Sequence, residues 1–312
     1  MRVGVLAAAV VACTVLPAPA AAADAAFEPE ATVRRVDRIA TLAVARAGDR
    51  LVAAGERGRI LLSEDQGATW KVAATPTHHT LTSVSFSDAK TGFATGHQGV
   101  LLRTEDGGVH WTQAAIDMKD KPALFAVRVA GGKGIAVGAY GTYLESTDAG
   151  RTWKSRRIGS PDFDKHLTGI APSGPGRLIL AGEAGTLFAT ADSGATWQAL
   201  KSPYAGSFFG AIGLANGTVI AYGMRGNAWR TTDGGKNWNR VGLGDYKGPL
   251  QGASELSDGV ALVGADGLIA ISRDGGATFA VKPDPSRATI TALLRTALGW
   301  IIASPSGLRV VP

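Results

Sequence analysis

Residues 104–111 read TEDGGVHW and residues 231–238 read TTDGGKNW, and four more segments of the chain repeat this eight-residue pattern. Each copy has Ser or Thr first, Asp third, Gly fifth and an aromatic residue eighth. The other four copies begin at Ser63, Ser146, Thr190 and Ser272. The aromatic residues follow one another at intervals of 41, 42, 44, 41 and 41 residues. A period near 40 residues with strand-like content is typical of a β-propeller in which each repeat forms one blade.

A second pattern begins each repeat and raises the count of blades to seven. It places an apolar residue first, a small residue third and an apolar residue fourth, which suits an innermost strand where blades converge on an axis. Its copies start at Ile39, Leu81, Leu124, Leu167, Phe208, Leu250 and Ile290. A Gly-x-x-Gly segment before each octapeptide predicts a two-residue turn between the second and third strands. We therefore predict an all-β protein, a seven-bladed β-propeller with four-stranded antiparallel blades.

The seventh repeat has only three predicted strands before the sequence ends at Pro312. Residues 31–36 precede the first innermost strand and have no other predicted partner. We expect them to form an N-terminal strand that joins the C-terminal blade and closes the ring, because closure leaves no exposed sheet edge. Residues 24–312 then form a single propeller domain.

Residues 1–23 have the composition of a cleaved secretory signal peptide, in which Arg2 precedes an apolar run and residues 21–23 offer a cleavage site. Cleavage there predicts an exported, periplasmic protein without direct membrane insertion. The only cysteine, Cys13, lies in this segment, where residues 10–13 weakly resemble a lipoprotein box. A lipid anchor through Cys13 is the alternative. The formal net charge of +6 is small, and with export it argues against nucleic acid as a partner.

The six aspartates of the octapeptides are interpreted as structural. Each lies at the turn between the third and fourth strands, where a carboxylate can accept backbone N–H groups and the following glycine supplies a positive φ. We expect the aromatic residue to cover this turn and to pack toward the next blade. Calcium binding is disfavoured, because one carboxylate per turn falls short of the about six to eight oxygens that calcium needs. These residues are Asp65, Asp106, Asp148, Asp192, Asp233 and Asp274.

The octapeptides resemble Asp-box (BNR) repeats, which occur in sialidases, some glycoside hydrolases, sortilin-type receptors and the photosystem II assembly and stability factor family. The organisation of residues 30–312 is most similar to the last family, whose members are exported seven-bladed propellers with the same glycine turn before each Asp-box. The resemblance implies a role in photosynthesis as a non-enzymatic scaffold. It implies binding of a protein or membrane-protein complex to assist its assembly or stability, and no cofactor.

Catalytic residues are not predicted. A sialidase needs an arginine triad, usually announced by Phe/Tyr-Arg-Ile-Pro, and the nearest segment, residues 37–40, reads DRIA. A glycosidase needs two carboxylates across a cleft, whereas Glu56, Glu183 and Asp266 lie in short turns with no predicted pairing. A metal site is not expected at the adjacent histidines 78 and 79, which point in opposite directions on a strand. A glycan-active hydrolase and an accessory protein of an envelope transport or efflux system stay as alternative functions.

Recognition is expected on one face of the disc. The Asp-box turns occupy one face, and the turns between second and third strands, together with the loops that join blades, occupy the opposite face, here called the loop face. Irregular loops with aromatic and cationic residues suit a protein partner of a monomeric scaffold. Arg57 and Arg225 share a Gly-x-Arg-Gly turn and are expected to form a basic rim for an acidic partner. The candidate binding residues are Arg57, His97, Phe125, Tyr140, Lys165, Tyr204, Phe209, Arg225, Tyr246 and Lys247.

Overall fold

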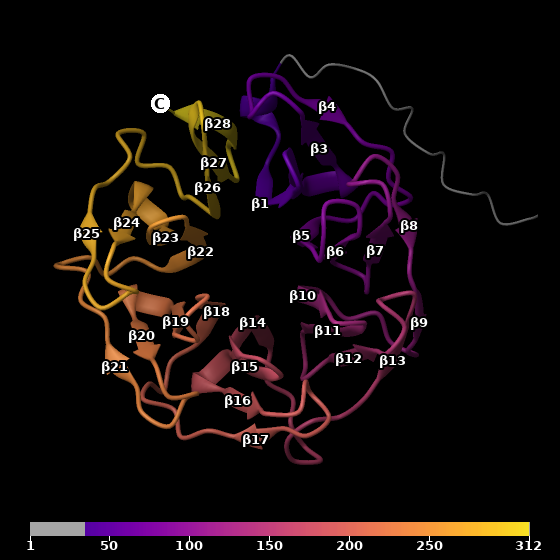
Figure 1. The fold of residues 1–312 in the computed structure, drawn as a ribbon, viewed down its shortest axis with the longest axis vertical. Coiled ribbons are helices and arrows are strands. Elements are labelled where there is room, and N and C mark those ends of the chain that lie inside the picture. Colours follow the sequence, from indigo (N-terminus) through magenta and orange to yellow (C-terminus); the bar gives the residue numbers. More distant parts are fainter. Residues whose placement is uncertain (1–34, 312) are drawn as a thin grey trace, which may run out of the picture.

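Seven β-sheets surround a central axis in the computed structural model, which describes residues 35–311 (Figure 1). Each sheet is one blade, and its first strand is the innermost. The first blade lies beside the last, so that the two ends of the described chain meet in the ring (Figure 1). The predicted all-β, seven-bladed propeller is confirmed.

Blades one to four follow the predicted strand order. Blade one contains β1 (Thr41–Ala47), β2 (Arg50–Gly55), β3 (Ile60–Ser63) and β4 (Lys71–Val72). Blade two contains β5 (Leu81–Phe86), β6 (Gly92–Gly96), β7 (Leu101–Thr104) and β8 (Thr112–Gln113). Blade three contains β10 (Leu124–Ala130), β11 (Lys133–Gly138), β12 (Tyr143–Ser146) and β13 (Thr152–Ser155). Blade four contains β14 (Leu167–Gly174), β15 (Arg177–Gly182), β16 (Leu187–Thr190) and β17 (Gln198–Ala199).

Blades five to seven complete the ring. Blade five contains β18 (Phe208–Gly213), β19 (Val219–Gly223), β20 (Ala228–Thr231) and β21 (Asn239–Arg240). Blade six contains β22 (Leu250–Leu256), β23 (Gly259–Gly264), β24 (Ile269–Ser272) and β25 (Ala280–Val281). Blade seven contains β26 (Ala292–Thr296), β27 (Gly299–Ser304) and β28 (Gly307–Val311). The 3₁₀ turns are η1 (Val36–Arg38), η2 (Glu56–Gly58), η3 (Glu183–Gly185), η4 (Met224–Gly226) and η5 (Ala265–Gly267).

Blade three has a fifth strand that the sequence pattern does not predict. Residues expected to lie in a loop after Trp111 form β9 (Ala115–Asp117), which pairs in parallel with β13 at the outer edge of blade three. Ile116 lies opposite Trp153 in this pairing and packs against the hydrophobic cluster between blades two and three. The connection therefore covers the edge of the next blade before it enters that blade at the axis.

The six Asp-box turns share one hydrogen-bond arrangement. The hydroxyl of the first residue donates to the aspartate and accepts the N–H of the fifth-position glycine, as in Ser146 with Asp148 (2.7 Å) and Gly150 (2.9 Å). The aspartate also accepts the backbone N–H of the seventh residue, 3.0 Å away in Thr152. For Asp233, backbone and side-chain hydrogen bonds from Asn237 lower the pKa of the carboxyl group to about 2. The predicted structural role of the aspartates agrees with these contacts.

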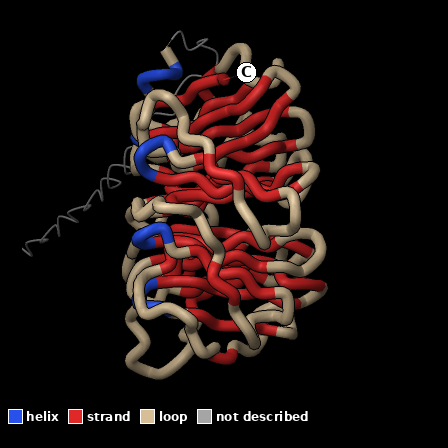
Figure 2. Tube along the Cα trace, turned by 90° about the vertical axis from the view of Figure 1, so that its left-hand side faces the viewer, coloured by secondary structure: helices blue, strands red, loops and turns tan. Residues whose placement is uncertain are grey.

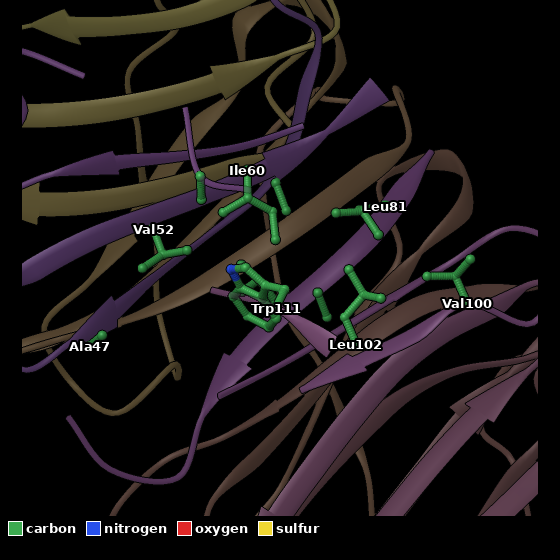
Figure 3. Close-up of a cluster of buried hydrophobic side chains, with 11 residues drawn as sticks. Ala47, Val52, Ile60, Leu81, Val100, Leu102 and Trp111 are labelled. Atoms are coloured by element: carbon green, nitrogen blue, oxygen red, sulfur yellow. The ribbon is translucent and has the colours of Figure 1, made fainter. Parts of the chain in front are cut away.

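The Asp-box aromatic residues pack on the preceding blade, so the expectation that they pack toward the next blade was wrong. Trp111 of blade two lies among Val52 and Ile60 of blade one (Figure 3). Trp153 of blade three meets Phe93 of blade two edge to face, with ring centroids 6.2 Å apart. The fifth-position glycine lies against the preceding blade, next to Phe93 for Gly150 and next to Leu62 and Val52 for Gly108, and it places no side chain between that blade and the turn.

Seven hydrophobic clusters fill the ring, and each one lies between two neighbouring blades. The cluster between blades seven and one contains Trp70, Ile301 and Leu308, with Val36 of η1 packed against it. Polar contacts join the same two blades: the Thr291 hydroxyl donates to the Thr41 carbonyl at 3.0 Å. The ring is therefore closed by side-chain packing between its first and last blades.

The predicted closing strand over residues 31–36 falls outside the described residues except for its last two positions. Val36 belongs to η1 and not to a strand, and the described part of the seventh sheet has three strands. The backbone of Asp37 lies so close to Gly307 that a Cβ there would be 2.1 Å from the Asp37 carbonyl carbon. Pairing of the N-terminal strand with β28 stays a prediction, as does the signal peptide over residues 1–23.

The two faces of the disc differ as predicted. Asp-box turns contact the turns between first and second strands, as in the bond from the Gly107 N–H to the Lys90 carbonyl (2.8 Å), so both lie on one face. The turns between second and third strands contact the inter-blade loops on the other face, as in the bond from the Gly141 N–H to the Lys165 carbonyl (2.9 Å). An edge-on view shows the short helical turns gathered on this loop face (Figure 2). No helix within residues 35–311 is long and apolar enough to cross a membrane.

Deletion of residues 24–37 is expected to lower the free energy of unfolding by several kcal/mol relative to a chain that begins at residue 24. Burial of Val36 contributes about 1 kcal/mol, and loss of a paired edge strand contributes the rest. Denaturant unfolding of both chains measures the total loss, and denaturant unfolding of Val36→Ser measures the part that comes from burial of Val36. Equal stability of the chains that begin at residues 24 and 38 would contradict N-terminal closure.

Asp106→Ala is expected to lower the free energy of unfolding by about 1–3 kcal/mol, because Thr104, Val109 and His110 all donate to its carboxylate. Burial opposes ionisation of Asp106, but these hydrogen bonds outweigh it and lower the pKa of the carboxyl group. The ionised Asp106 carboxylate therefore stabilises the folded protein fully above the unfolded-state pKa of aspartate, and this stabilisation is lost as pH falls below about 4. The difference between wild type and variant should shrink there, whereas Lys236→Ala, at an exposed box position, should behave as wild type. A gap that stays constant down to pH 2 would argue against the carboxylate's role.

Candidate functional site

Six equivalent turns on the loop face present one side chain each at the tip. The first of the two central residues has a φ between 51° and 57°, and the glycine after it has a φ between 65° and 73°. An N–H to C=O bond closes each turn, as from Arg59 to Glu56 at 3.1 Å. These are type I′ turns, and their two central residues are the third residue and the second glycine of each Gly-x-x-Gly segment. The tip residues are Arg57, Gln98, Tyr140, Ala184, Arg225 and Asp266.

Most of these tip residues are unfavourable for the backbone that they adopt. The left-handed region costs roughly 1–2 kcal/mol for residues with a Cβ, and type I′ turns strongly prefer Asn, Asp or Gly first. Of the six tip residues, only Asp266 satisfies this preference. Arg57, Tyr140 and Arg225 therefore hold positions that Asn would occupy at less cost, as Gln98 and Ala184 do in the equivalent turns.

The two arginine tips are free to bind a partner. Arg57 and Arg225 are both exposed, and neither guanidinium has a hydrogen bond or ion pair with any residue in 35–311. They belong to blades one and five and lie on the same face, as predicted. Their charge is therefore directed to solvent and does not stabilise the ring.

Tyr140 begins a chain of aromatic contacts that runs from the tip of blade three toward the axis. Its side chain is 73% exposed, and its ring meets the His166 ring edge to face with centroids 5.0 Å apart. The Tyr140 backbone N–H donates to His166 Nδ1 at 3.1 Å. His166 in turn contacts Phe125, with centroids 6.1 Å apart, at the start of β10. We call Phe125, Tyr140 and His166 the aromatic cluster.

Charged groups surround the aromatic cluster. Glu183 accepts the His166 backbone N–H at 3.1 Å, and its Oε2 atom is 3.7 Å from His166 Nδ1. Lys165 is exposed and pairs with Asp164 at 3.0 Å. The structure thus brings together three predicted candidates, Phe125, Tyr140 and Lys165, around a histidine that orients the tyrosine.

Sequence reasoning missed His166, although a signal was present. The residue just before each innermost strand packs its carbonyl over the last glycine of the second strand, and in the other blades that residue is smaller or is proline. These equivalents are Ala40, Thr80, Ala123, Ser207 and Pro249. A histidine at a position where the other blades have a smaller residue or proline is therefore a signal that its side chain extends beyond the loop. Here that side chain contacts Tyr140.

Two predicted candidates, Tyr204 and Tyr246, contact neighbouring tip turns, and their part in binding stays a prediction. The Tyr204 carbonyl group lies against Gly185, the Tyr246 carbonyl group and ring lie against Gly226, and both residues are half-buried. The Tyr246 hydroxyl donates to carbonyl oxygens of Pro249 (2.9 Å) and Ala265 (3.1 Å), and burial raises its pKa to about 12. Their hydroxyl groups are thus partly occupied inside the molecule.

The remaining predicted candidates are spread around the loop face. Phe209 occupies the same position in β18 that Phe125 occupies in β10, at a register shift next to the axis. Both phenylalanines are half-buried, whereas His97 and Lys247 are exposed on the tip turn of blade two and on the loop between blades five and six. The structure therefore separates these residues from the aromatic cluster, and their part in binding stays a prediction.

A groove with a cavity volume of about 1010 Å³ opens beside Tyr140. It lies between the loop before β10 and the loop after β13, and Met118, Pro122, Arg157 and Phe163 line it with Tyr140. Its volume and mixed lining suit a segment of a partner in contact with Tyr140 of the aromatic cluster.

The alternative catalytic and metal sites have no assembled geometry in the described part. Glu56, Glu183 and Asp266 lie in the tip turns of blades one, four and six, and no contact joins any two of them within residues 35–311. No group of three His, Cys, Asp or Glu residues in the same range has the arrangement of a metal site.

This architecture defines the class: the chain is a seven-bladed Asp-box β-propeller whose loop face carries exposed, strained tip residues. Within that class, the model of the photosynthesis system II assembly factor YCF48 family matches residues 62–241. The match covers more than half of the sequence, and the chain belongs to this family.

Known proteins resemble the chain to different extents. The photosystem II assembly lipoprotein Ycf48 of Picosynechococcus sp. is 44% identical over 109 residues, which are 35% of this chain and only 32% of that protein. A structure of YCF48 bound to D1 peptide has a TM-score of 0.68 at 18% identity and covers 92% of this chain and 96% of its own. YCF48 from Cyanidioschyzon merolae has a TM-score of 0.67 at 16% identity over 87% and 94%. Both structures share the propeller fold.

Arg57→Asn and Arg225→Asn are each expected to raise the free energy of unfolding by about 0.5–1 kcal/mol, because asparagine tolerates the left-handed backbone of a type I′ turn. Asp266→Asn is the matched control, since its turn already has a favourable residue, and should change stability little. Denaturant unfolding measures all three. A gain that is no larger at the arginines than at Asp266 would show that the tips are not strained.

Proposed function

We propose that this chain is an exported, non-enzymatic scaffold that binds a protein partner through its loop face and so assists the assembly or stability of a membrane complex. The observation that carries the proposal is the set of tip residues Arg57, Tyr140 and Arg225. They are exposed, they are held in a backbone conformation that other residues would adopt more easily, and the two guanidinium groups make no hydrogen bond or ion pair with residues 35–311.

The chemistry of this face favours a partner segment with carboxylates and apolar side chains. Arg57 and Arg225 would steer and bind acidic groups, and charge-assisted bonds to guanidinium are among the stronger protein contacts. Tyr140 offers an amphipathic ring beside the groove of blade three, and such tyrosines are typical anchors of protein interfaces. Family membership and the D1 peptide in the YCF48 complex support a protein ligand and a role at photosystem II.

The non-enzymatic part of the proposal rests on the separation of the carboxylates. A glycosidase reaction needs two of them on either side of one bond. The acidic residues of the loop-face turns belong to different blades, and Glu183 is occupied with the His166 backbone. No observation in the described part favours the transport-accessory or glycan-hydrolase alternatives.

The test is capture of the partner from detergent-solubilised membranes of the source organism, followed by titration of the captured protein. The double variant Arg57→Glu/Arg225→Glu is expected to bind at least about tenfold more weakly at low salt, a difference of about 1.4 kcal/mol, and the difference should shrink at high salt. Lys90→Glu/Lys236→Glu, which changes the same charge on exposed residues of the Asp-box face, should bind as wild type.

Two outcomes would reject the basic rim, and a third would reject recognition by the loop face. Equal affinities of wild type and the loop-face variant, or binding that is insensitive to salt, would remove the basic rim and leave Phe125 and Phe209 as the better candidates. Loss of binding in the Lys90/Lys236 control with the rim intact would show that the partner uses the opposite face. Thermal melting of all variants checks that each has folded.

A further inference from the structure

Arg128 lies near the axis on the Asp-box face, away from the proposed recognition face. It belongs to β10, close to the end where that strand turns into β11. Two hollows meet at its side chain. One, of about 540 Å³, opens at the axis beside β14 and β18, and the other, of about 390 Å³, lies between the first hairpins of blades three and four.

The Arg128 guanidinium has no partner among residues 35–311, although it is half-buried. Burial without a compensating contact lowers the pKa of its guanidinium. Other arginines near blade boundaries bind the Asp-box carbonyl of the next blade: Arg50 binds Gly107 at 2.9 Å and Arg230 binds Gly275 at 2.8 Å. Arg128 therefore does not belong to this set of structural contacts.

The two hollows beside Arg128 are lined by apolar side chains together with polar and charged groups. Ile170, Pro172, Ile212 and Leu214 line the hollow at the axis, and Lys133 lines the hollow between the hairpins. Among residues 35–311, Glu255 is the one acidic residue that lines either hollow, and its Oε1 atom accepts the Ala215 N–H at 2.9 Å. The site thus combines an unpaired planar cation with hydrophobic surface and backbone.

We propose that Arg128 is the anion-binding residue of a second site, on the Asp-box face, for a carboxylate carried on an apolar body. The guanidinium fork matches a carboxylate in two parallel hydrogen bonds, and the isoleucine, leucine and proline walls would cover the apolar part. The carboxylate of such a ligand would supply a negative charge to pair with the Arg128 guanidinium, for which residues 35–311 provide none. A free organic acid and the C-terminus of a peptide share this chemistry.

Isothermal titration calorimetry at constant salt tests the site with paired probes. The first pair is 4-phenylbutyrate and 4-phenylbutan-1-ol, and the second is an acetylated octapeptide ending in Leu-Phe with a free or an amidated C-terminus. Wild type is expected to bind at least one carboxylate probe about tenfold or more tightly than its neutral partner. The arm with the higher affinity identifies the source of the carboxylate.

Variants locate the binding at Arg128. Arg128→Gln should lose about tenfold or more in affinity for the carboxylate probe, and Arg128→Lys should retain part of it, because lysine keeps the charge but loses the fork. Arg240→Gln, which removes one exposed charge at the outer edge of blade five, should bind as wild type. Without ligand, Arg128→Gln should melt no lower than wild type, because it removes an unpaired, half-buried charge.

Several results would overturn the second site. These are no binding of either carboxylate probe below about 1 mM, equal binding of charged and neutral probes, and unchanged affinity in Arg128→Gln. A lower melting temperature of ligand-free Arg128→Gln would show that the guanidinium has a structural partner. Because Arg128 and the loop-face tips lie on opposite faces, none of these outcomes depends on the partner proposed above.

Discussion

The contact between an Asp-box glycine and the second strand of the preceding blade is the constraint on which the rest of the ring depends. A Cβ on Gly67 would lie 2.4 Å from Ile301 Cδ1, and a Cβ on Gly276 would lie 2.4 Å from Ile220 Cδ1. The aromatic residue three positions later fills the space beside this contact, and the aspartate holds the turn that places both groups. Each Asp-box carboxylate therefore stabilises the interface between blades indirectly, because it fixes the turn that carries the glycine and the aromatic residue.

Because the blades are joined in this way, the side chains at the tips of the loop-face turns are not needed to hold neighbouring blades together. The seven hydrophobic clusters lie between the sheets, and the arginine tips add no bond to them. A rigid ring can hold a few unfavourable backbone conformations, which is how strained residues persist at binding sites. The same ring places His166 beside Tyr140, where it accepts the Tyr140 backbone N–H and contacts the edge of the exposed tyrosine ring.

Local patterns were sufficient for the fold, because each blade is built from short-range turns. The count of seven follows from the apolar and small residues of the innermost strands, and the tight turns and the separation of the two faces follow from Gly and Asp positions repeated near 40 residues apart. Contacts between blades were not predictable in the same way. The direction of Trp111, the added strand β9 and the meeting of Phe125, Tyr140 and His166 depend on how neighbouring repeats lie against each other. The hydroxyl bonds of Tyr246 likewise join segments that the sequence pattern treats as separate loops.

Hydrogen–deuterium exchange of the captured complex against the free protein tests the central claim most directly, because it reports both faces in one experiment. The account predicts that partner binding slows exchange in the tip turns at residues 56–59, 139–142 and 224–227. It predicts no change in the Asp-box turns at residues 104–111 and 231–238, which are held by their own hydrogen bonds in both states. Protection confined to the Asp-box turns, with unchanged tips, would contradict the assignment of recognition to the loop face.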